Sequence, residues 1–198
     1  MKKVLTVILV VMVAVLFLSG CTMRYVLKDT ITPDVVLDKK SSEKVLVVID
    51  NEIKDYVENI HASSLEGSIH TYIITLGGAF YDGLISSVKS KYLNVTVSDG
   101  TELSSFDKII KFSMTEHKLK FVYATELFST KAVVNYRLGV EMTVIDGKTE
   151  SVLKTKKLEG NADFEGDANE TTVDKYLGQT AKEGIKEVVN KAVSELIQ

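Results

Sequence analysis

Hydrophobic and polar residues follow one another with different spacings along the chain, and each spacing predicts a kind of element. Val45–Ile49 is a run of five apolar residues, mostly β-branched, which predicts a central strand buried on both faces. Apolar and polar residues alternate at 93–97 and over 134–144, which is typical of strands with one buried face. We expect a further strand within 106–123.

The segment 152–164 is expected to form an edge strand. It follows Asp146-Gly147, a strong hairpin signal, and its lysines at 154, 156 and 157 would protect an open edge from unwanted pairing. Two shorter candidate strands lie at 24–27 and 56–61.

Two segments have helical spacing, 68–92 and 173–196. The apolar stripe of the first steps by three or four residues through Ile69, Ile73, Leu76, Phe80, Leu84, Val88 and Tyr92. Ser68 is the expected N-cap. Gly77, Gly78 and Gly83 interrupt this pattern, at about 1 kcal/mol each relative to alanine. They indicate either a hinge or, as we favour, close backbone contact with the sheet.

These elements predict an α+β fold, namely a two-layer sandwich with a mainly antiparallel sheet and two long helices on one face. Residues 44–198 are expected to form a single domain. Residues 21–43 are polar, contain Pro33, and are interpreted mainly as a tether between this domain and whatever precedes it. In that interpretation Phe80 and Leu138 are buried where the first helix meets the sheet.

The first twenty residues have the pattern of a secretory signal peptide. Lys2 and Lys3 precede the apolar run Val4–Leu18, which is short for a membrane span of roughly 20 residues. The sequence Leu18-Ser19-Gly20-Cys21 then resembles the lipobox of bacterial lipoproteins with a type II signal peptide.

This resemblance implies that Cys21, the single cysteine, receives a diacylglyceryl thioether and that the leader is cleaved before it. Thiolate chemistry requires cysteine rather than serine, and two or more acyl chains give stable attachment. Thr22 follows instead of aspartate, which implies the periplasmic face of the outer membrane. The membrane is thus the first expected partner.

Composition restricts the other partners. The chain has 24 Lys and Arg against 27 Asp and Glu, and loss of Lys2 and Lys3 with the leader would leave a net charge of −5. No clustered basic excess indicates a nucleic-acid partner. No cysteine would remain for a disulfide, so packing must supply the stability.

No catalytic or metal motif stands out in the sequence. His61, His70 and His117 lack the spacing of a metal site, and no nucleophile elbow or phosphate loop is present. Acidic residues at 163, 165, 167 and 170 resemble a calcium loop only loosely and are interpreted as a solvated loop. We therefore expect a non-enzyme with no cofactor and no metal.

The segment 118–128 is the candidate partner contact, with Lys118, Lys120, Phe121, Tyr123 and Phe128 as its candidate residues. Mixed basic and aromatic residues suit an exposed hairpin tip that touches a protein or lipid. They suit a long strand with one buried face equally well. Both interpretations stay open.

The order of elements after the lipobox, including "LGGAFYDGLISSVKSKYLNVTVSDG", resembles small periplasmic lipoproteins that serve envelope machines. These are the LPS-assembly lipoprotein, the auxiliary lipoproteins of ABC-type lipid transporters and the YajG-like lipoproteins. The resemblance implies a non-catalytic accessory or scaffold of an assembly or transport machine. The alternative is a lipid-anchored binding protein for a small ligand or glycan.

Replacing Cys21 by serine is expected to block lipidation and leave an uncleaved precursor, because a hydroxyl does not supply the thiolate nucleophile. Intact-mass measurement on the membrane fraction checks this. A Cys21→Ser chain with normal mature mass and normal membrane retention would contradict the prediction.

Overall fold

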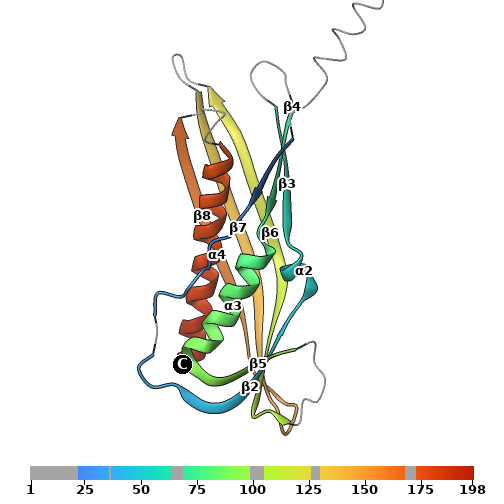
Figure 1. Ribbon diagram of the computed structural model, residues 1–198, viewed down its shortest axis with the longest axis vertical. Coiled ribbons are helices and arrows are strands. Elements are labelled where there is room, and N and C mark those ends of the chain that lie inside the picture. Colours follow the sequence, from blue (N-terminus) through green and yellow to red (C-terminus); the bar gives the residue numbers. More distant parts are fainter. Residues whose placement is uncertain (1–21, 36, 64–68, 99–104, 126–129, 168–172) are drawn as a thin grey trace, which may run out of the picture.

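The computed structural model describes residues 22–198 apart from 36, 64–68, 99–104, 126–129 and 168–172 (Figure 1). The elements in chain order are β1 (Thr22–Val26), β2 (Ser41–Ile49), α2 (Asn51–Lys54), β3 (Val57–Ser63), β4 (Ile69–Thr75), α3 (Gly77–Lys91), β5 (Tyr92–Val97), β6 (Lys108–Thr125), β7 (Thr130–Asp146), β8 (Val152–Asp167) and α4 (Val173–Ile197). Among the described residues, none of the helices has the apolar length needed to span a bilayer.

The described strands form two mixed sheets. The larger has the order β5-β2-β6-β7-β8, in which β2 runs parallel to β5 and β6 while β6, β7 and β8 are antiparallel. The smaller has the order β1-β4-β3, with β1 parallel to β4. The α+β class is confirmed. The longest pairings are antiparallel, but the expectation of one sheet is wrong, because β2 reaches both of its neighbours through crossovers and the chain between β2 and β5 supplies two strands of a second sheet.

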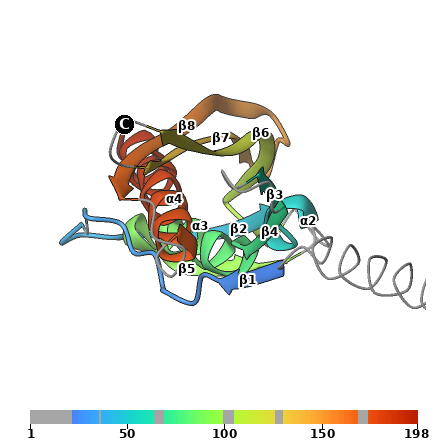
Figure 2. The ribbon, with the colours of Figure 1, turned by 90° about the horizontal axis from the view of Figure 1, so that it is seen from above.

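The two long helices, α3 and α4, lie between β7–β8 of the large sheet and β1 of the small sheet, whereas β6 contacts β3 directly (Figure 2). Seen down the long axis, α3 and α4 have β7 and β8 on one side and β1 on the other (Figure 2). α4 contacts β7, β8, β1 and α3, so it belongs to every interface of this layer.

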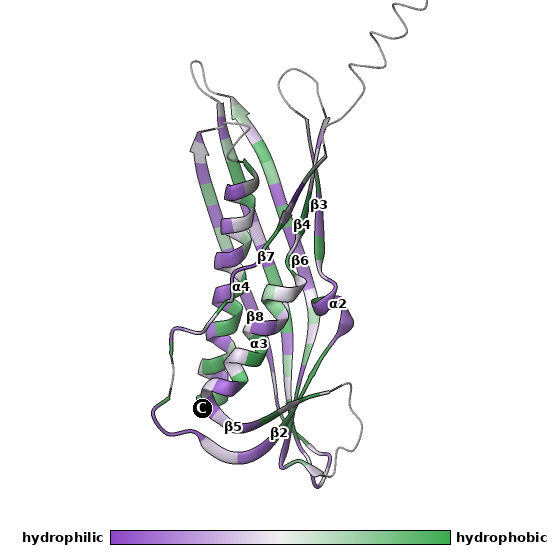
Figure 3. Cartoon of the chain, viewed as in Figure 1, coloured by the Kyte–Doolittle hydropathy of each residue, from purple (hydrophilic) through white to green (hydrophobic). Residues whose placement is uncertain are grey.

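The burial of the large sheet follows the sequence pattern. Val45, Leu46 and Val47 of β2 are fully buried, and β2 lies between two strands, so the predicted central strand is confirmed. Along β7 the even-numbered residues from Ala132 to Val144 are buried, and apolar and polar positions alternate along the long strands (Figure 3).

β8 is the outermost strand of its sheet in the described residues, as its lysines predicted. Lys154 donates to the backbone carbonyl of Glu195 at 2.8 Å and pairs with its carboxylate at 2.7 Å. Lys91 donates to the carbonyl of Leu196 from the other side. The hydrogen bond from Lys154 holds the pKa of Glu195 below its usual value. These two lysines thus cap the C-terminus of α4, where a helix favours positive charge.

The predicted helix at 68–92 is wrong in its first part. Residues 69–75 form β4, and α3 begins at Gly77; Ser68 lies outside the described residues. Ile69-His-Thr-Tyr-Ile-Ile-Thr is rich in β-branched residues, and Tyr72 and Ile74 are buried two positions apart. Ile69 and Ile73 share a strand face as well as a helix face, so the spacing alone did not decide. The second helix, predicted at 173–196, is confirmed.

Two of the three glycines in this region occupy crowded positions. A Cβ at Gly77 would overlap the backbone carbonyl of Lys54, and one at Gly83 would lie 2.9 Å from the side chain of Val189. Gly78 has nothing within 4 Å of a Cβ. The close contacts are therefore with the end of α2 and with α4, not with the sheet.

The N-terminal segment, predicted mainly as a tether, packs on the fold over most of its described length. β1 pairs with β4, which agrees with the candidate strand at 24–27, and Leu27 and Ile31 are buried. These two buried residues are four positions apart and too few to have indicated packing in the sequence.

Polar and aromatic contacts fix this segment along one face of α4. The ring of Tyr25 lies over Gly178, where a Cβ would be 2.5 Å from its Cζ. Asp29 pairs with Lys182 at 2.6 Å, and Asp34 with Lys186 at 2.6 Å. The α4 partners are spaced by four residues, so they lie on one face of the helix. We call residues 22–34 the strap.

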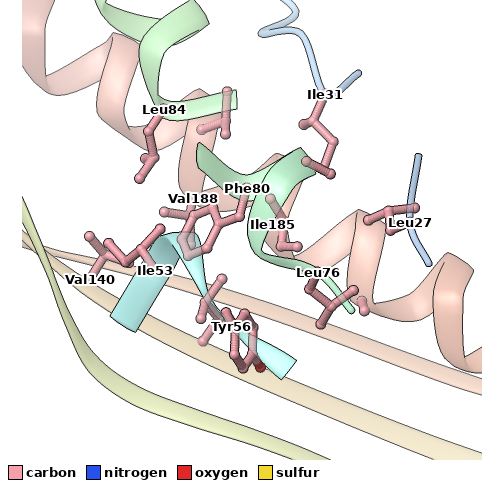
Figure 4. Close-up of a cluster of buried hydrophobic side chains, with 14 of the residues drawn as sticks. Leu27, Ile31, Ile53, Tyr56, Leu76, Phe80, Leu84, Val140, Ile185 and Val188 are labelled. Carbon is pink, nitrogen blue, oxygen red and sulfur yellow. The ribbon is translucent and has the colours of Figure 1, made fainter. Parts of the chain in front are cut away.

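The core lies where α3, α4 and the turn after β2 meet (Figure 4). Phe80 is 0% exposed, and Leu138 on β7 is 2% exposed, so the predicted burial of both side chains is confirmed. Phe80 lies among Ile53, Ile185 and Val188 in the close-up. The strap contributes Leu27 and Ile31 to the same core cluster.

Gly77→Ala and Gly78→Ala form a matched pair at adjacent positions. Gly77→Ala is expected to destabilise the fold by about 1–3 kcal/mol, because the methyl overlaps the Lys54 carbonyl. Gly78→Ala should be neutral or stabilising by up to about 1 kcal/mol, since it adds a helix former in open space. Urea unfolding of both variants measures this, and equal free energies of unfolding would refute the close-contact explanation.

Candidate functional site

The candidate contact segment lies on β6, a strand of 18 residues. Its pairing with β7 shifts by one residue between Met114 and Glu116. After this bulge Leu119 and Phe121 point inward and are each 8% exposed, while Lys118 and Lys120 are exposed on the outer face. The interpretation as a long strand with one buried face is confirmed for 118–123, and the exposed hairpin tip is wrong there. Phe128 lies outside the described residues.

Phe121 and Tyr123 therefore leave the set of candidate contacts. The ring of Phe121 meets Tyr72 of β4 edge-on at 5.8 Å and Tyr123 edge-on at 4.7 Å. Such aromatic pairs stabilise packing between elements. Here the Phe121–Tyr72 pair joins the large sheet to the small one, and neither Phe121 nor Tyr123 faces solvent together with the lysines.

The outer face of β6, β7 and β8 brings the lysines next to residues from two other strands. Lys118 is opposite Arg137, which is opposite Asn161. Lys120 is opposite Asn135, which is opposite Asp163 and donates to its carboxylate at 2.7 Å. The residues around a polar hollow of about 340 Å³ on this face are Glu116, Lys118, Lys120, Asn135, Arg137 and Asp163. We call this set the outer-face site.

The charges of the outer-face site are unevenly compensated. Like charges directly opposite each other on neighbouring strands destabilise a sheet, and Lys118 and Arg137 are such a pair. Within the described residues, neither Lys118 nor Arg137 forms an ion pair shorter than 4 Å. Lys157, on the neighbouring strand β8, does pair with Glu159 at 2.9 Å, and its hydrogen bond lowers the pKa of the Glu159 carboxyl. Lys118 and Arg137 thus line the hollow without an ion pair of their own, together with the carboxylates of Glu116 and Asp163.

This arrangement can bind an anionic group without any chemical step. Arginine presents a planar set of donors to a carboxylate or phosphate, and the lysines add point charges. Glu116 and Asp163 would repel a second anionic group placed beyond the cations. The site therefore favours a ligand whose negative charge is local and whose neighbouring groups are neutral or basic.

The sequence indicated only part of this site. Alternation within 118–123 could have assigned the lysines and the aromatic residues to opposite faces. Arg137, Asn135 and Glu116 join the site only through the register of β6 and β7, which the sequence pattern does not state. Asp163 was interpreted as part of a solvated acidic loop, but residues 163, 165 and 167 lie on β8.

A second polar cluster lies on the inner side, between the sheets. Glu58 of β3 accepts hydrogen bonds from the Tyr56 hydroxyl at 2.8 Å and from His117 Nδ1 at 2.9 Å. Tyr136 donates to the Tyr56 oxygen at 3.1 Å, and burial raises the pKa of both phenols well above the usual value. Every member has a partner, so the cluster is a satisfied connection between β3, β6 and β7. The part of the chain that the structure describes contains no group of three residues able to hold a metal ion.

Comparisons with known proteins relate the chain by fold alone. No protein-family model matches it, and no curated protein matches it by sequence. A crystal structure of a Xanthomonas campestris protein of the DUF330 family is similar, with a TM-score of 0.55 and 11% identity over 88% of this chain and 94% of that one. A minor lipoprotein of Acinetobacter baumannii matches with a TM-score of 0.43 and 9% identity, covering 78% of this chain and 92% of that one. The first of these supports a shared fold.

Lys120→Ser and Phe121→Ser are adjacent changes on opposite faces of β6. Phe121→Ser is expected to lower the free energy of unfolding by about 3–5 kcal/mol, because it leaves a cavity and buries a hydroxyl. Lys120→Ser should change it by less than about 0.5 kcal/mol. Thermal and urea unfolding measure the two, and a fully stable Phe121→Ser variant would return this ring to the candidate contacts.

Proposed function

We propose that the protein is a lipid-anchored lipoprotein on the periplasmic face of the outer membrane and a non-catalytic accessory of an envelope assembly or transport machine. Cys21 would carry the lipid, and the outer-face site would receive the partner. The resemblance to the LPS-assembly, transporter-auxiliary and YajG-like lipoproteins supports the choice of machine, and the fold shared with the DUF330 structure is compatible with it.

The anchor rests on the lipobox Leu18-Ser19-Gly20-Cys21. Its cysteine directly precedes the first described residue of the fold, Thr22. Since the chain would lose the apolar leader on cleavage, the acyl chains on Cys21 would be its attachment to the membrane.

The opposed pair Lys118 and Arg137 is the observation that carries the partner surface. Natural sequences accept locally unfavourable arrangements chiefly where function requires them. The pair lies on two long, paired strands rather than on a loop, so its backbone is held in place by the sheet. Acidic side chains of a partner protein would relieve the repulsion and gain charge-assisted hydrogen bonds.

The alternative, a binding protein for a small ligand or glycan, is favoured by the polar lining of the same hollow. Asn135 and Asp163 offer the donors and acceptors that hydroxyl groups require, and Arg137 could hold an acidic sugar. The hollow lies on an open strand face, so a small ligand would leave much of its own surface in water. A larger partner gains more from such a face.

Reversing the charges of Lys118 and Arg137 tests the proposal on the full, lipidated chain. Lys118→Glu/Arg137→Glu is expected to reduce capture of the partner from detergent-solubilised membranes by at least about tenfold, because every ~1.4 kcal/mol lost weakens affinity tenfold. Capture by the unchanged protein should also fall as salt is raised, since exposed charges are screened. Quantitative mass spectrometry of the captured proteins provides the measurement.

Lys39→Glu/Lys89→Glu is the matched control, because both lysines are exposed away from the outer-face site and the net charge changes equally. Unchanged capture by the Lys118/Arg137 variant, or an equal loss in both variants, would refute the outer-face site as the partner surface. Charge-dependent binding of an acidic oligosaccharide, with no protein captured, would favour the alternative.

A further inference from the structure

The strap leaves almost no free chain between Cys21 and the folded protein. β1 begins at Thr22 and is paired with β4 from that residue on. Consecutive Cα atoms are about 3.8 Å apart, so a lipid on Cys21 would attach the small sheet to the membrane with one peptide unit between them. The contacts of Tyr25, Asp29 and Asp34 with α4 keep this segment in place.

The outer face of the small sheet begins at that attachment point. Three residues from each described strand point away from the core, since Tyr72 and Ile74 on β4 and Ile60 on β3 point into it. On this side Arg24, Val26, Asn59 and His61 are exposed, and the β4 residues between them are half-buried. This face is therefore open and lies next to the anchor.

Its chemistry differs from that of the rest of the surface, because no carboxylate is among its nine described positions. Arg24 is exposed, and His61 contacts Thr71 at 3.1 Å. Val26 and Val57 are 50% and 37% exposed. The acidic residue of β3, Glu58, points inward to Tyr56. In a chain with an excess of acidic residues, this is a neutral to basic face with exposed apolar groups.

We infer that the outer face of the β1-β4-β3 sheet lies on the lipid surface that carries the Cys21 lipid; this rests on the proposed lipidation. Anionic headgroups attract arginine, and the valines and threonines can enter the interface without burying a charge. The outer-face site then faces away from the bilayer, because β7 lies on the opposite side of the helices from β1 (Figure 2). The protein could therefore contact the bilayer through the small sheet and a partner through the outer-face site at the same time.

Two single fluorescent labels, at the same level along the long axis of the molecule but on opposite sheets, distinguish this arrangement from attachment by one end of the molecule. Asn59→Cys lies on the small sheet's outer face, and Asn161→Cys lies on the large sheet's outer face. The two positions are at the same level along this axis. Asn59 follows Glu58, which contacts His117, and His117 lies near the Arg137–Asn161 pair in the register of the large sheet. The lipid occupies the sulfur of Cys21, so each chain carries one free thiol for a fluorophore.

The lipidated chains are placed in vesicles of phosphatidylethanolamine and phosphatidylglycerol that contain a headgroup-labelled quencher lipid. Several-fold stronger quenching at position 59 than at position 161 is expected. Val26→Glu/Val57→Glu should remove this difference, while Val122→Glu/Val152→Glu, at valines 55% and 61% exposed on other strands, should preserve it. Arg24→Glu serves as a second variant if the double change unfolds the small sheet.

Equal quenching at the two positions, or a difference that survives Val26→Glu/Val57→Glu in a folded chain, would overturn the inference. Intact-mass measurement separates this failure from that of the anchor. A lipidated chain with equal quenching refutes only the docked face, whereas a chain without lipid on Cys21 refutes the anchor and the docked face together.

Discussion

The close packing of α4 on the large sheet is the contact on which the other interfaces depend. A Cβ at Gly160 of β8 would overlap the carbonyl of Gly184 on α4, and a Cβ at Gly184 would overlap the ring of Tyr136. Only glycine allows the helix to come this near to the strands. The helix thereby buries Tyr136 completely, and the Tyr136 hydroxyl donates to Tyr56. The same packing therefore fixes the distance between the large sheet and the start of β3. The strap follows α4 and takes its position from the helix.

Elements with a single strong period were predictable from the sequence, while those that depend on long-range pairing were not. The buried run at 45–49 and the alternation at 134–144 each permitted one interpretation, and α4 had a full stripe without competing strand propensity. Residues 69–75 fitted a helix and a strand, and only their pairing with β1 and β3 decides for the strand. The strap could not be recognised either, because its buried residues are few and its ion pairs need α4 as a partner.

The two proposed surfaces are compatible because they lie on the outer faces of two sheets whose inner faces are packed inside the molecule. A partner that meets the outer face of β6–β8 meets strands whose opposite side is already packed, β7 and β8 on α4 and β6 on the small sheet, so binding there requires no opening of the core. The small sheet is joined to the large one by the aromatic contact of Phe121 with Tyr72 and by the Glu58–His117 hydrogen bond.

The bulge on β6 determines which chemistry the outer face presents. Before it, Ile110 and Phe112 point inward; after it, Leu119 and Phe121 do, so the inward phase changes from even to odd numbers while β7 keeps one phase throughout. A one-residue shift exchanges the two faces of a strand. Gly139 on β7 lies opposite the bulge, where a Cβ would come within 2.7 Å of the Thr115 hydroxyl. Without the bulge, Lys118 and Lys120 of β6 would face the core, and Phe121 would face solvent. The outer-face site is thus specified by the bulge between Met114 and Glu116.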